Sequence, residues 1–314
     1  MRICDMGPAP DGIGLLECPE HWTEARQPMT ERTDHADKRA IADNYGRPDL
    51  ERTILDAYED AGTDTARLTR DDTAALDEFH IQGRDATRAL ADLADLDPGD
   101  RVLDVGSGIG GPARTLAAEF DCHVTGIDLV EEYCRVAETL TERLGLEGRV
   151  SVRRVNAVDL PFDDNAFDAV WLQHVSMNVA EKGRLADELH RVLRPGGQLA
   201  LHEVCAGPGG DPYFPVPWAD DSSISHLATA KELSRLLAET GFEELEWIDA
   251  TDDSLEWFRS KLEAMAARPA DAPPPLGLNL LMGPETPTKM KNVVRNLEDE
   301  RIAVVQGVVK KPDQ

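Results

Sequence analysis

Residues Arg101–Leu116 read R-V-L-D-V-G-S-G-I-G-G-P-A-R-T-L, and this stretch decides the fold. The run Val102–Val105 is short and apolar apart from Asp104, as a buried parallel strand requires. Gly106–Gly111 follows, and its glycines permit positive φ and a close approach of the backbone to a ligand. Pro112 suits the first turn of a helix, whose free N–H groups would face that ligand. We therefore expect a strand, a glycine loop and a helix.

Two classes of ligand fit such a loop. Gly106, Gly108 and Gly111 match the spacing G-x-G-x-x-G of dinucleotide-binding loops, which is weak evidence when it stands alone. Asp128 ends a second apolar run about 20 residues beyond the loop, where either ligand class would find a carboxylate for its ribose hydroxyls. Asp104 distinguishes the two, because an acid beside the loop disfavours pyrophosphate and suits a ligand with an ammonium group. S-adenosylmethionine is such a ligand, and NAD is not.

The motifs V-L-D-V-G-S-G-I-G-G and G-I-D-L resemble the first two motifs of class I S-adenosylmethionine-dependent methyltransferases. The resemblance continues in family order through Asn156–Phe162, Phe167–Gln173 and Leu193–Gly197, and covers roughly Leu76 to Val204. It implies an α/β fold, a Rossmann-like seven-stranded sheet with helices on both faces. The pattern adds an N-terminal helical extension and a helical capping insertion before the last strand. The later strands are expected at His123–Asp128, Val150–Val155, Ala169–Gln173, Gln198–Val204, Phe242–Ala250 and Ile302–Val309.

The resemblance assigns the cofactor S-adenosyl-L-methionine to residues in the loops after the strands. These candidates are Asp104, Gly106, Ser107, Gly108, Gly110, Asp128, Leu129, Asn156, Ala157 and Gln173. Asn156 departs from the family, which usually has an acid there that meets the adenine amino group. The side-chain carbonyl of asparagine can still accept that hydrogen bond.

Candidate substrate and catalytic residues follow the fourth strand, because ligands bind at the carboxyl ends of strands in open α/β sheets. Gln173–Asn178 reads Q-H-V-S-M-N there, although Asn178 also suits helix capping. The segment Asp77–Thr87 resembles a part of small-molecule methyltransferases that lies over the cofactor, although its histidine also suits an ordinary helix start. The catalytic candidates are His174 and His80. The substrate-binding candidates are His174, Met177, Asn178, Tyr213 and Trp218.

Two segments are expected to cover the substrate. Pro208–His226 combines prolines and aromatic residues and follows the fifth strand, although plain packing on the sheet edge explains it equally well. The insertion contains helical patterns at Leu255–Ala267 and Thr288–Leu297, with the apolar stretch Leu276–Met282 between them. The expected division of the chain is 1–40 loosely ordered, 41–96 helical extension, 97–250 cofactor-binding core, 251–301 capping insertion and 302–314 last strand and tail. Met29 is an alternative translation start.

The composition limits the function classes. Sixty acidic against 33 basic residues give a net charge of −27, which disfavours nucleic acid and anionic membranes as partners. No stretch is long and apolar enough for a membrane span. The five cysteines are scattered, so we expect no metal site and a cytoplasmic location. The acid excess suggests a halophilic protein, and an acidic bacterial protein of no special habitat is the alternative. The oligomeric state stays open.

The substrate is expected to be a small molecule. F-H-I-Q-G, G-G-P-A-R and the insertion are similar to sarcosine and dimethylglycine N-methyltransferases that make betaine, and the acidic composition favours this choice. Arg84, Arg114 and Arg295 are then candidates to bind the substrate carboxylate. The same motifs occur in ubiquinone, tocopherol and sterol methyltransferases, so C- or O-methylation of a quinol, phenol or polyketide-like metabolite is an alternative. A non-catalytic protein that binds S-adenosylmethionine is a second alternative.

Overall fold

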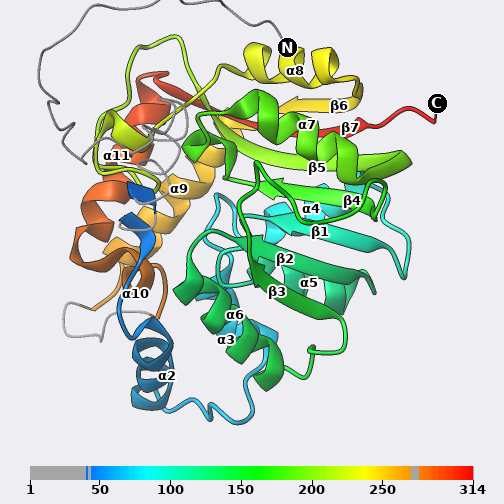
Figure 1. The fold of residues 1–314 in the computed structure, drawn as a ribbon. Helices are drawn as coiled ribbons and strands as arrows, with labels where there is room; N and C mark the ends of the chain where they lie inside the picture. The colour runs from blue at the N-terminus through cyan, green and yellow to red at the C-terminus, as the bar shows by residue number, and fades with distance from the viewer. Residues whose placement is uncertain (1–39, 42–43, 270–275, 314) are drawn as a thin grey trace, which may run out of the picture.

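The computed structural model describes residues 40–41, 44–269 and 276–313. A seven-stranded sheet with strand order β3-β2-β1-β4-β5-β7-β6 runs through the molecule (Figure 1). Neighbouring strands from β3 to β5 are parallel, and β7 is antiparallel to both β5 and β6. The strands are β1 Arg101–Val105, β2 His123–Asp128, β3 Val150–Arg154, β4 Phe167–Gln173, β5 Leu193–Ala206, β6 Glu243–Asp249 and β7 Ile302–Lys310.

Helices cover both faces of the sheet. On one face α4 Arg84–Leu93, α5 Gly111–Glu119 and α6 Glu131–Arg143 bury small and branched side chains against the strands. On the other face α7 Lys182–Val192 and α8 Ala230–Thr240 do the same with leucines. Central strands that are covered on both faces need nearly continuous apolar sequences, which explains the short apolar runs. The expected α/β fold with helices on both faces is confirmed (Figure 1).

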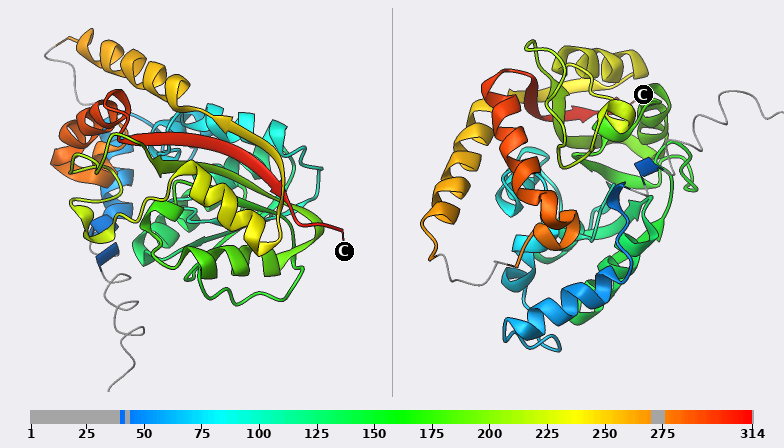
Figure 2. Two further views of the ribbon diagram at one scale, coloured as in Figure 1. Left: turned by 90° about the horizontal axis from the view of Figure 1, so that it is seen from above. Right: turned by 90° about the vertical axis from the view of Figure 1, so that its left-hand side faces the viewer.

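The capping insertion lies between β6 and β7. It contains α9 Thr251–Ala266, α10 Asn279–Met282 and α11 Thr286–Glu298, which group at one end of the sheet (Figures 1 and 2). Two N-terminal helices, α2 Leu50–Asp60 and α3 Arg70–Asp77, lie near the same end. Trp218, Phe258 and Val293 belong to one buried apolar cluster, so the loop after β5 packs directly against α9 and α11. This end carries the carboxyl ends of the parallel strands, where ligands bind in α/β sheets.

Two glycines of the loop after β1 are required by close packing. A Cβ on Gly106 would lie 2.4 Å from Cγ2 of Val175, and the residue has φ 68°. A Cβ on Gly111 would lie 1.9 Å from the carbonyl oxygen of Asp77 at the end of α3. The glycines therefore let α3 and the loop after β4 lie directly against the loop after β1.

Most sequence-based element boundaries agree with the structure to within a few residues. β5 begins earlier than expected, because Leu193 already pairs with Phe167 across a register shift. The helix α6 was not predicted from the sequence, although Tyr133, Val136 and Leu140 supply a buried face at helical spacing. β6 is an edge strand whose alternation does not correspond to burial, since nearly all of its residues are exposed. The expectations for residues 1–39, including the alternative start at Met29, lie outside the described residues.

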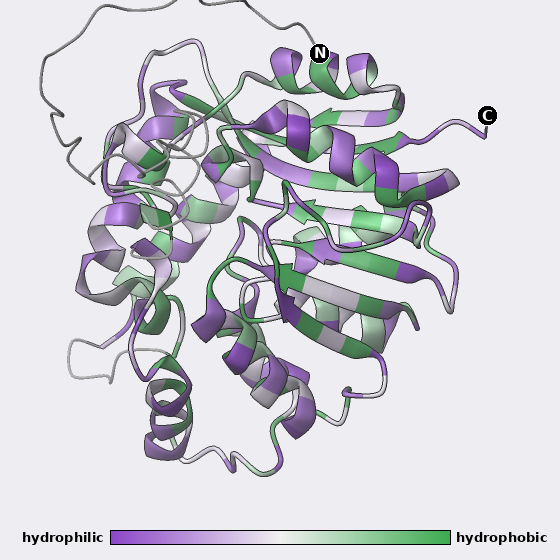
Figure 3. Cartoon of the chain, in the orientation of Figure 1, coloured by the Kyte–Doolittle hydropathy of each residue, from purple (hydrophilic) through white to green (hydrophobic). Residues whose placement is uncertain are grey.

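Hydrophobic residues concentrate on the strands, and hydrophilic residues lie along the outer helices (Figure 3). Within the ranges that the structure describes, no helix has the length and apolar composition needed to cross a bilayer. Cys122, Cys134 and Cys205 are all buried free thiols. No group of three or more metal-binding side chains gathers among the described residues.

Candidate functional site

Two adjoining cavities open at the carboxyl ends of β1 and β4. The glycine-loop cavity, of about 510 Å³, is lined by residues that follow β1, β2 and β3. The capped cavity, of about 110 Å³, lies beneath the insertion and the loop after β5. They share five lining residues: Tyr45, Phe79, Gly106, Tyr133 and His174. A ligand in one cavity therefore meets a ligand in the other at these side chains.

Asp128 is one of two acidic residues, with Glu181, that line the glycine-loop cavity. One carboxylate oxygen accepts a hydrogen bond from the amide of Gly108 at 2.9 Å, and the other accepts from the amide of Val130 at 2.8 Å. Burial raises the pKa of Asp128 to about 6. Each oxygen keeps a second lone pair, so the carboxylate can also bind a pair of ribose hydroxyls. Asn156 lines the same cavity, and its Oδ1 lies 3.4 Å from the amide of Val158.

Asp104 is a buried carboxylate beside the glycine loop, and it lines the capped cavity with Ser107. Its Oδ2 has no hydrogen-bond partner within the described part of the chain. Burial raises the pKa of Asp104 to about 7. An unpartnered acceptor of this kind fits an ammonium group, as S-adenosylmethionine carries. Asp104 and Asp128 together thus suit the two polar ends of that cofactor.

A buried ion network lies behind the loop. The guanidinium of Arg114 is 2.7 Å from Asp77, and Arg70 lies 2.8 Å from the same carboxylate. Burial alone would raise the pKa of Asp77, but the charges of Arg114 and Arg70 lower it below its ordinary value. The network joins α3 to α5 at the point where Gly111 contacts Asp77. It therefore fixes the segment that leads to Phe79 and His80.

His80 is held by hydrogen bonds on both sides of its ring. Nε2 lies 3.1 Å from the carboxylate of Glu78, and Nδ1 lies 3.2 Å from the carbonyl oxygen of Ile81. Burial would raise the pKa of Glu78, but the hydrogen bond and charge of His80 lower it. The hydroxyl of Thr87 also lies 3.2 Å from Nε2. Both ring nitrogens of His80 therefore already have partners within the protein.

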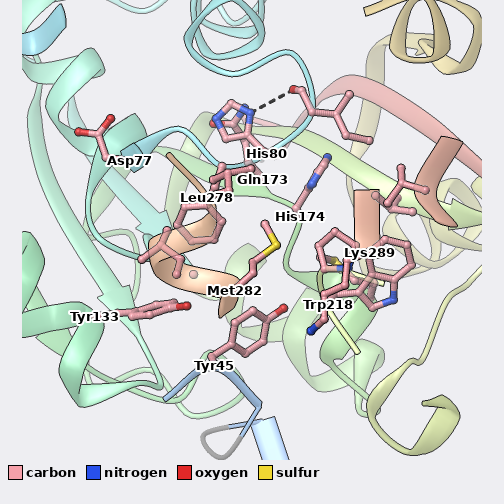
Figure 4. Close-up of a pocket in the computed structure, with 18 of the residues that line it drawn as sticks. Tyr45, Asp77, His80, Tyr133, Gln173, His174, Trp218, Leu278, Met282 and Lys289 are labelled. Carbon is pink, nitrogen blue, oxygen red and sulfur yellow. Dashed lines mark hydrogen bonds between the residues drawn. The ribbon is translucent and has the colours of Figure 1, made fainter. Parts of the chain in front are cut away.

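His174 stands where the two cavities meet (Figure 4). It has φ 55°, an uncommon backbone conformation for a residue other than glycine, and its amide donates to the carbonyl oxygen of His202 at 2.9 Å. Burial lowers the pKa of His174 well below 6.5, and His202 and His80 lower it further. Its Nε2 has no partner among the described residues. The side chain is therefore a neutral imidazole whose Nε2 stays open to a ligand.

Hydrogen bonds fix the loop that carries His174. The carboxylate of Glu203 accepts from the amides of Val175 at 2.9 Å and Ser176 at 3.0 Å. Asn178 accepts from the hydroxyl of Tyr45 at 2.8 Å, and its amide donates to carbonyl oxygens at 2.9 Å. Those carbonyls belong to residues 218 and 224, so Asn178 ties Tyr45 and the loop after β5 to β4.

The walls of the capped cavity are largely apolar. α9, α10 and α11 contribute side chains to it, together with the loop after β5 and the segment at residue 81. The apolar lining residues are Phe79, Ile81, Pro112, Met177, Val204, Pro217, Trp218, Trp257, Phe258, Leu278, Leu281, Met282, Met290 and Val293. Two cations, Arg47 and Lys289, also line it. The cavity therefore suits a ligand with an apolar body and a small number of polar groups.

The structure gathers most of the candidate site residues at these cavities. Those that line one or both are Asp104, Gly106, Ser107, Gly108, Asp128, Leu129, Asn156, Ala157, Gln173, His174, Met177, Asn178, Trp218 and His80. Gly110 does not line either cavity and instead precedes α5. Tyr213 lies elsewhere too, because its ring packs against Arg295 and Arg301, whose guanidinium carbons are 3.6 and 4.0 Å from its centroid.

The three arginines considered as carboxylate anchors are engaged outside the cavities. Arg114 is in the buried network, and Arg84 pairs with Asp71 at 2.9 Å. Arg295 stacks on Tyr213. The sequence analysis missed the cations that do line the capped cavity, Arg47 and Lys289, and the rings of Tyr45, Tyr133 and Trp257. Only Lys289 offered a cue, since it is one of eight lysines in a lysine-poor chain.

The chain is similar to known proteins across this region. Residues 103–201 match the family described as methyltransferase domain. Over 231 residues the chain is 30% identical to a glycine/sarcosine/dimethylglycine N-methyltransferase from Actinopolyspora halophila, covering 72% of this chain and 38% of that protein. Over 189 residues it is 30% identical to methyltransferase GfsG from Streptomyces halstedii, covering 58% of this chain and 67% of that protein.

A solved structure extends the similarity to nearly the whole chain. The [4+2]-cyclase SpnF superimposes with a TM-score of 0.64 at 26% sequence identity, over 88% of this chain and 97% of that one. That protein is named as a cyclase. Likeness of fold and sequence at this level therefore leaves the reaction to be decided from the site.

Proposed function

Because the chain belongs to the class I S-adenosylmethionine-dependent methyltransferases, we propose that it methylates a small molecule held in the capped cavity. The single observation that carries the proposal is the junction of the two cavities at His174. The glycine-loop cavity has Asp128 and the glycines that suit S-adenosylmethionine, and Asp104 lies beside the glycine loop in the adjoining capped cavity. Helices of the insertion close the capped cavity. A nucleophile in one cavity thus meets the cofactor in the other.

Each residue has a proposed role. Asp128 would bind the ribose hydroxyls, Asn156 would lie near the base, and Asp104 would bind the ammonium group of the cofactor. S-adenosylmethionine would supply a methyl group on a positively charged sulfur, with the neutral thioether of S-adenosylhomocysteine as the leaving group. Tyr45 and Tyr133 meet edge to face, with centroids 6.1 Å apart, at the junction of the cavities and exclude water from it. His174 takes the proton of the nucleophile as general base, because it is neutral and its Nε2 is open.

The apolar walls favour a substrate with an apolar body. Fourteen apolar side chains in the wall suit a phenol, quinol or polyketide-like metabolite, methylated on oxygen or carbon. Such nucleophiles gain most from a general base, which His174 provides. The apolar stretch 276–282 of the insertion supplies Leu278, Leu281 and Met282 to these walls.

Sarcosine or dimethylglycine is the second candidate substrate. The 30% identity to the Actinopolyspora halophila enzyme and the net charge of −27 support it. Trp218 and Trp257 line the capped cavity and could offer aromatic faces to a methylated ammonium. The three arginines first considered as carboxylate anchors lie elsewhere, so this substrate would need Arg47 or Lys289 instead.

The test is methyl transfer from labelled S-adenosylmethionine to a mixed panel of phenols, quinols, hydroxylated polyketide fragments, glycine, sarcosine and dimethylglycine. Turnover of the aromatic and apolar members supports the first substrate class, and turnover confined to the glycine derivatives supports the second. Calorimetry with the cofactor runs beside it. Tight cofactor binding without turnover of any member would favour a non-catalytic or cyclase-like role and contradict the proposed methyl transfer.

A further inference from the structure

Lys289 is the unusual side chain of the capped cavity. It lies on α11, its side chain is only 4% exposed, and it lines the cavity together with Trp218 and Trp257 (Figure 4). Taking an ammonium group out of water is expensive unless a partner compensates the charge. A methionine or leucine would line such a wall without that cost. A buried lysine at this place therefore indicates that the charge itself is used.

The counter-ion of Lys289 is largely exposed to solvent. Nζ lies 2.7 Å from a carboxylate oxygen of Asp220, whose side chain is 61% exposed. Asp220 belongs to the loop after β5 and is not among the residues that line the cavity. An ammonium has three N–H donors, and this one carboxylate oxygen does not use them all. An anionic group inside the cavity could therefore bind to Lys289 beside Asp220 or in its place.

Arg47, the other cation of the cavity, is already engaged. Its Nε lies 3.2 Å from the carbonyl oxygen of Leu281, and its Nη2 lies 3.0 Å from that of Met282. These bonds fasten the N-terminal segment to α10, so Arg47 has a structural task. Lys289 is left as the cation that a ligand can approach from within the cavity.

We propose that Lys289 binds a carboxylate of the substrate, and that Asp220 is its counter-ion when the cavity holds no substrate. This inference rests on the proposed function and narrows its substrate to an acid with an apolar body. One ammonium matches a single negative charge. A diphosphate would need further cations or a metal ion, and the described residues offer no cluster of metal-binding side chains.

The charge of the whole chain makes the inference testable. A protein of net charge −27 repels anions from its surface, so any preference for an anionic ligand must come from a local group. The interaction with a buried ammonium is also less screened by salt than a surface contact. A preference for carboxylate over alcohol that persists in 0.5 M salt would thus point to a buried site.

The experiment uses the full chain saturated with S-adenosylhomocysteine and three probes of equal chain length: decanoate, decanol and decyltrimethylammonium. Binding is followed by tryptophan fluorescence, because Trp218 and Trp257 line the cavity. We expect decanoate to bind at least tenfold more tightly than decanol, and decyltrimethylammonium to bind most weakly. Lys289→Met should abolish the difference between decanoate and decanol, whereas Lys289→Arg should keep most of it. Asp220→Asn should tighten decanoate binding by removing the competing carboxylate.

Lys291→Met is the matched control, since Lys291 lies on the same helix and is exposed. It should behave as the wild type. Equal binding of decanoate and decanol by the wild type overturns the inference, and so does a preference that survives Lys289→Met. If Lys289→Met fails to bind S-adenosylhomocysteine, the inference is tested instead by the preference of the wild type for decanoate over decanol and by the affinity of Asp220→Asn for decanoate. If decanol and decanoate bind equally well, only the proposed role of Lys289 is contradicted. If none of the three probes binds, the apolar substrate cavity of the proposed function is contradicted as well.

Discussion

The rings of His174 and His202 meet edge to face with their centroids 5.1 Å apart. His202 lies on β5 and is fully buried, and burial lowers its pKa to about 3. The ring centroid of His80, whose Nε2 lies 3.1 Å from the carboxylate of Glu78, is 6.1 Å from the centroids of both rings. Burial and the neighbouring His202 and His80 lower the pKa of His174, which keeps it in its basic form at the junction of the two cavities.

His174→Gln tests the general base. We expect kcat to fall by roughly 10²–10⁴-fold for an oxygen or carbon nucleophile, while the affinity for S-adenosylmethionine changes little. Because the pKa of His174 lies well below 6.5, its protonation should not reduce kcat between pH 8 and pH 6.5. Rates from pH 5 to 9 measure both effects. His123→Gln, on an exposed residue at the start of β2, is the control, and full activity of His174→Gln would contradict the assignment.

Asp104→Asn tests the proposed ammonium site by pH. The pKa of Asp104 is raised to about 7 by burial, so the carboxyl is protonated below that pH. An ammonium ligand prefers the carboxylate, and affinity for S-adenosylmethionine should fall about tenfold per pH unit below pH 7. Calorimetry from pH 5.5 to 8.5 should show this slope in the wild type and a weaker one in Asp104→Asn. The pH dependence of cofactor affinity that remains in Asp104→Asn is expected to come from Asp128, whose pKa is raised to about 6.

The raised pKa of Asp104 also predicts how the stability of the folded chain depends on pH. The pKa of Asp104 in the folded chain lies above its ordinary 3.8, so the folded state binds the proton more tightly than the unfolded one. Its contribution to the free energy of unfolding is therefore most favourable below about pH 4 and declines as the pH rises to 7. For the ammonium site itself, the contradicting result would be a cofactor affinity that depends on pH in the same way in Asp104→Asn and in the wild type.

Asp128→Ala tests the proposed ribose site. The carboxylate accepts amide hydrogen bonds from Gly108 and Val130, so its loss removes a ligand partner and loosens the glycine loop. We expect cofactor binding to weaken by about 1.5–3 kcal/mol, the range for a hydrogen bond to a charged group. Calorimetry measures it, with Asp163→Ala as a control on an exposed acid outside both cavities. Unchanged affinity, or binding of NAD in place of S-adenosylmethionine, would contradict the cofactor assignment.

The fold was predictable because its determinants are local. Val102–Val105 and the glycines after it specify a buried strand and a tight loop without reference to the rest of the chain. The cofactor residues follow those strands at fixed positions, so the sequence also brings Asp104 and Asp128 to one edge. α6 was missed because its buried face, at Tyr133 and Val136, is interleaved with charged residues.

The capped cavity was predictable only in outline. Its wall joins Tyr45 to Lys289, which are far apart in sequence, and such contacts depend on tertiary packing. Tyr213 is an example, because the sequence of a loop does not show which of its side chains face a cavity. In the structure this ring packs against Arg295 and Arg301 instead. Arg114, likewise, compensates a buried acid and not a substrate.

Gly111→Ala tests the packing of α3 on the glycine loop. A Cβ would lie 1.9 Å from the carbonyl oxygen of Asp77, and backbone atoms there cannot yield as a flexible side chain does. We expect a loss of about 2–4 kcal/mol in the free energy of unfolding. The control is Gly183→Ala, in α7 with open space around the new methyl group, which should stabilise by about 0.5–1 kcal/mol. Denaturant unfolding compares the two, and equal effects would show that the close contact is not a constraint.

Salt should stabilise the chain. The acidic excess is spread over the surface, and exposed ion pairs such as Arg52–Asp56 are each worth little, so repulsion among acids outweighs them. The Debye length shrinks from about 30 Å at 0.01 M to about 3 Å at 1 M, which removes that repulsion. Tm should therefore rise steadily from low to molar KCl. It should rise less in a variant with lysines at Glu243, Glu244 and Glu246, because these exposed glutamates crowd the edge strand β6. Sucrose at matched viscosity controls for general solvent effects, and a flat or falling curve in KCl would remove the support for a salt-adapted protein.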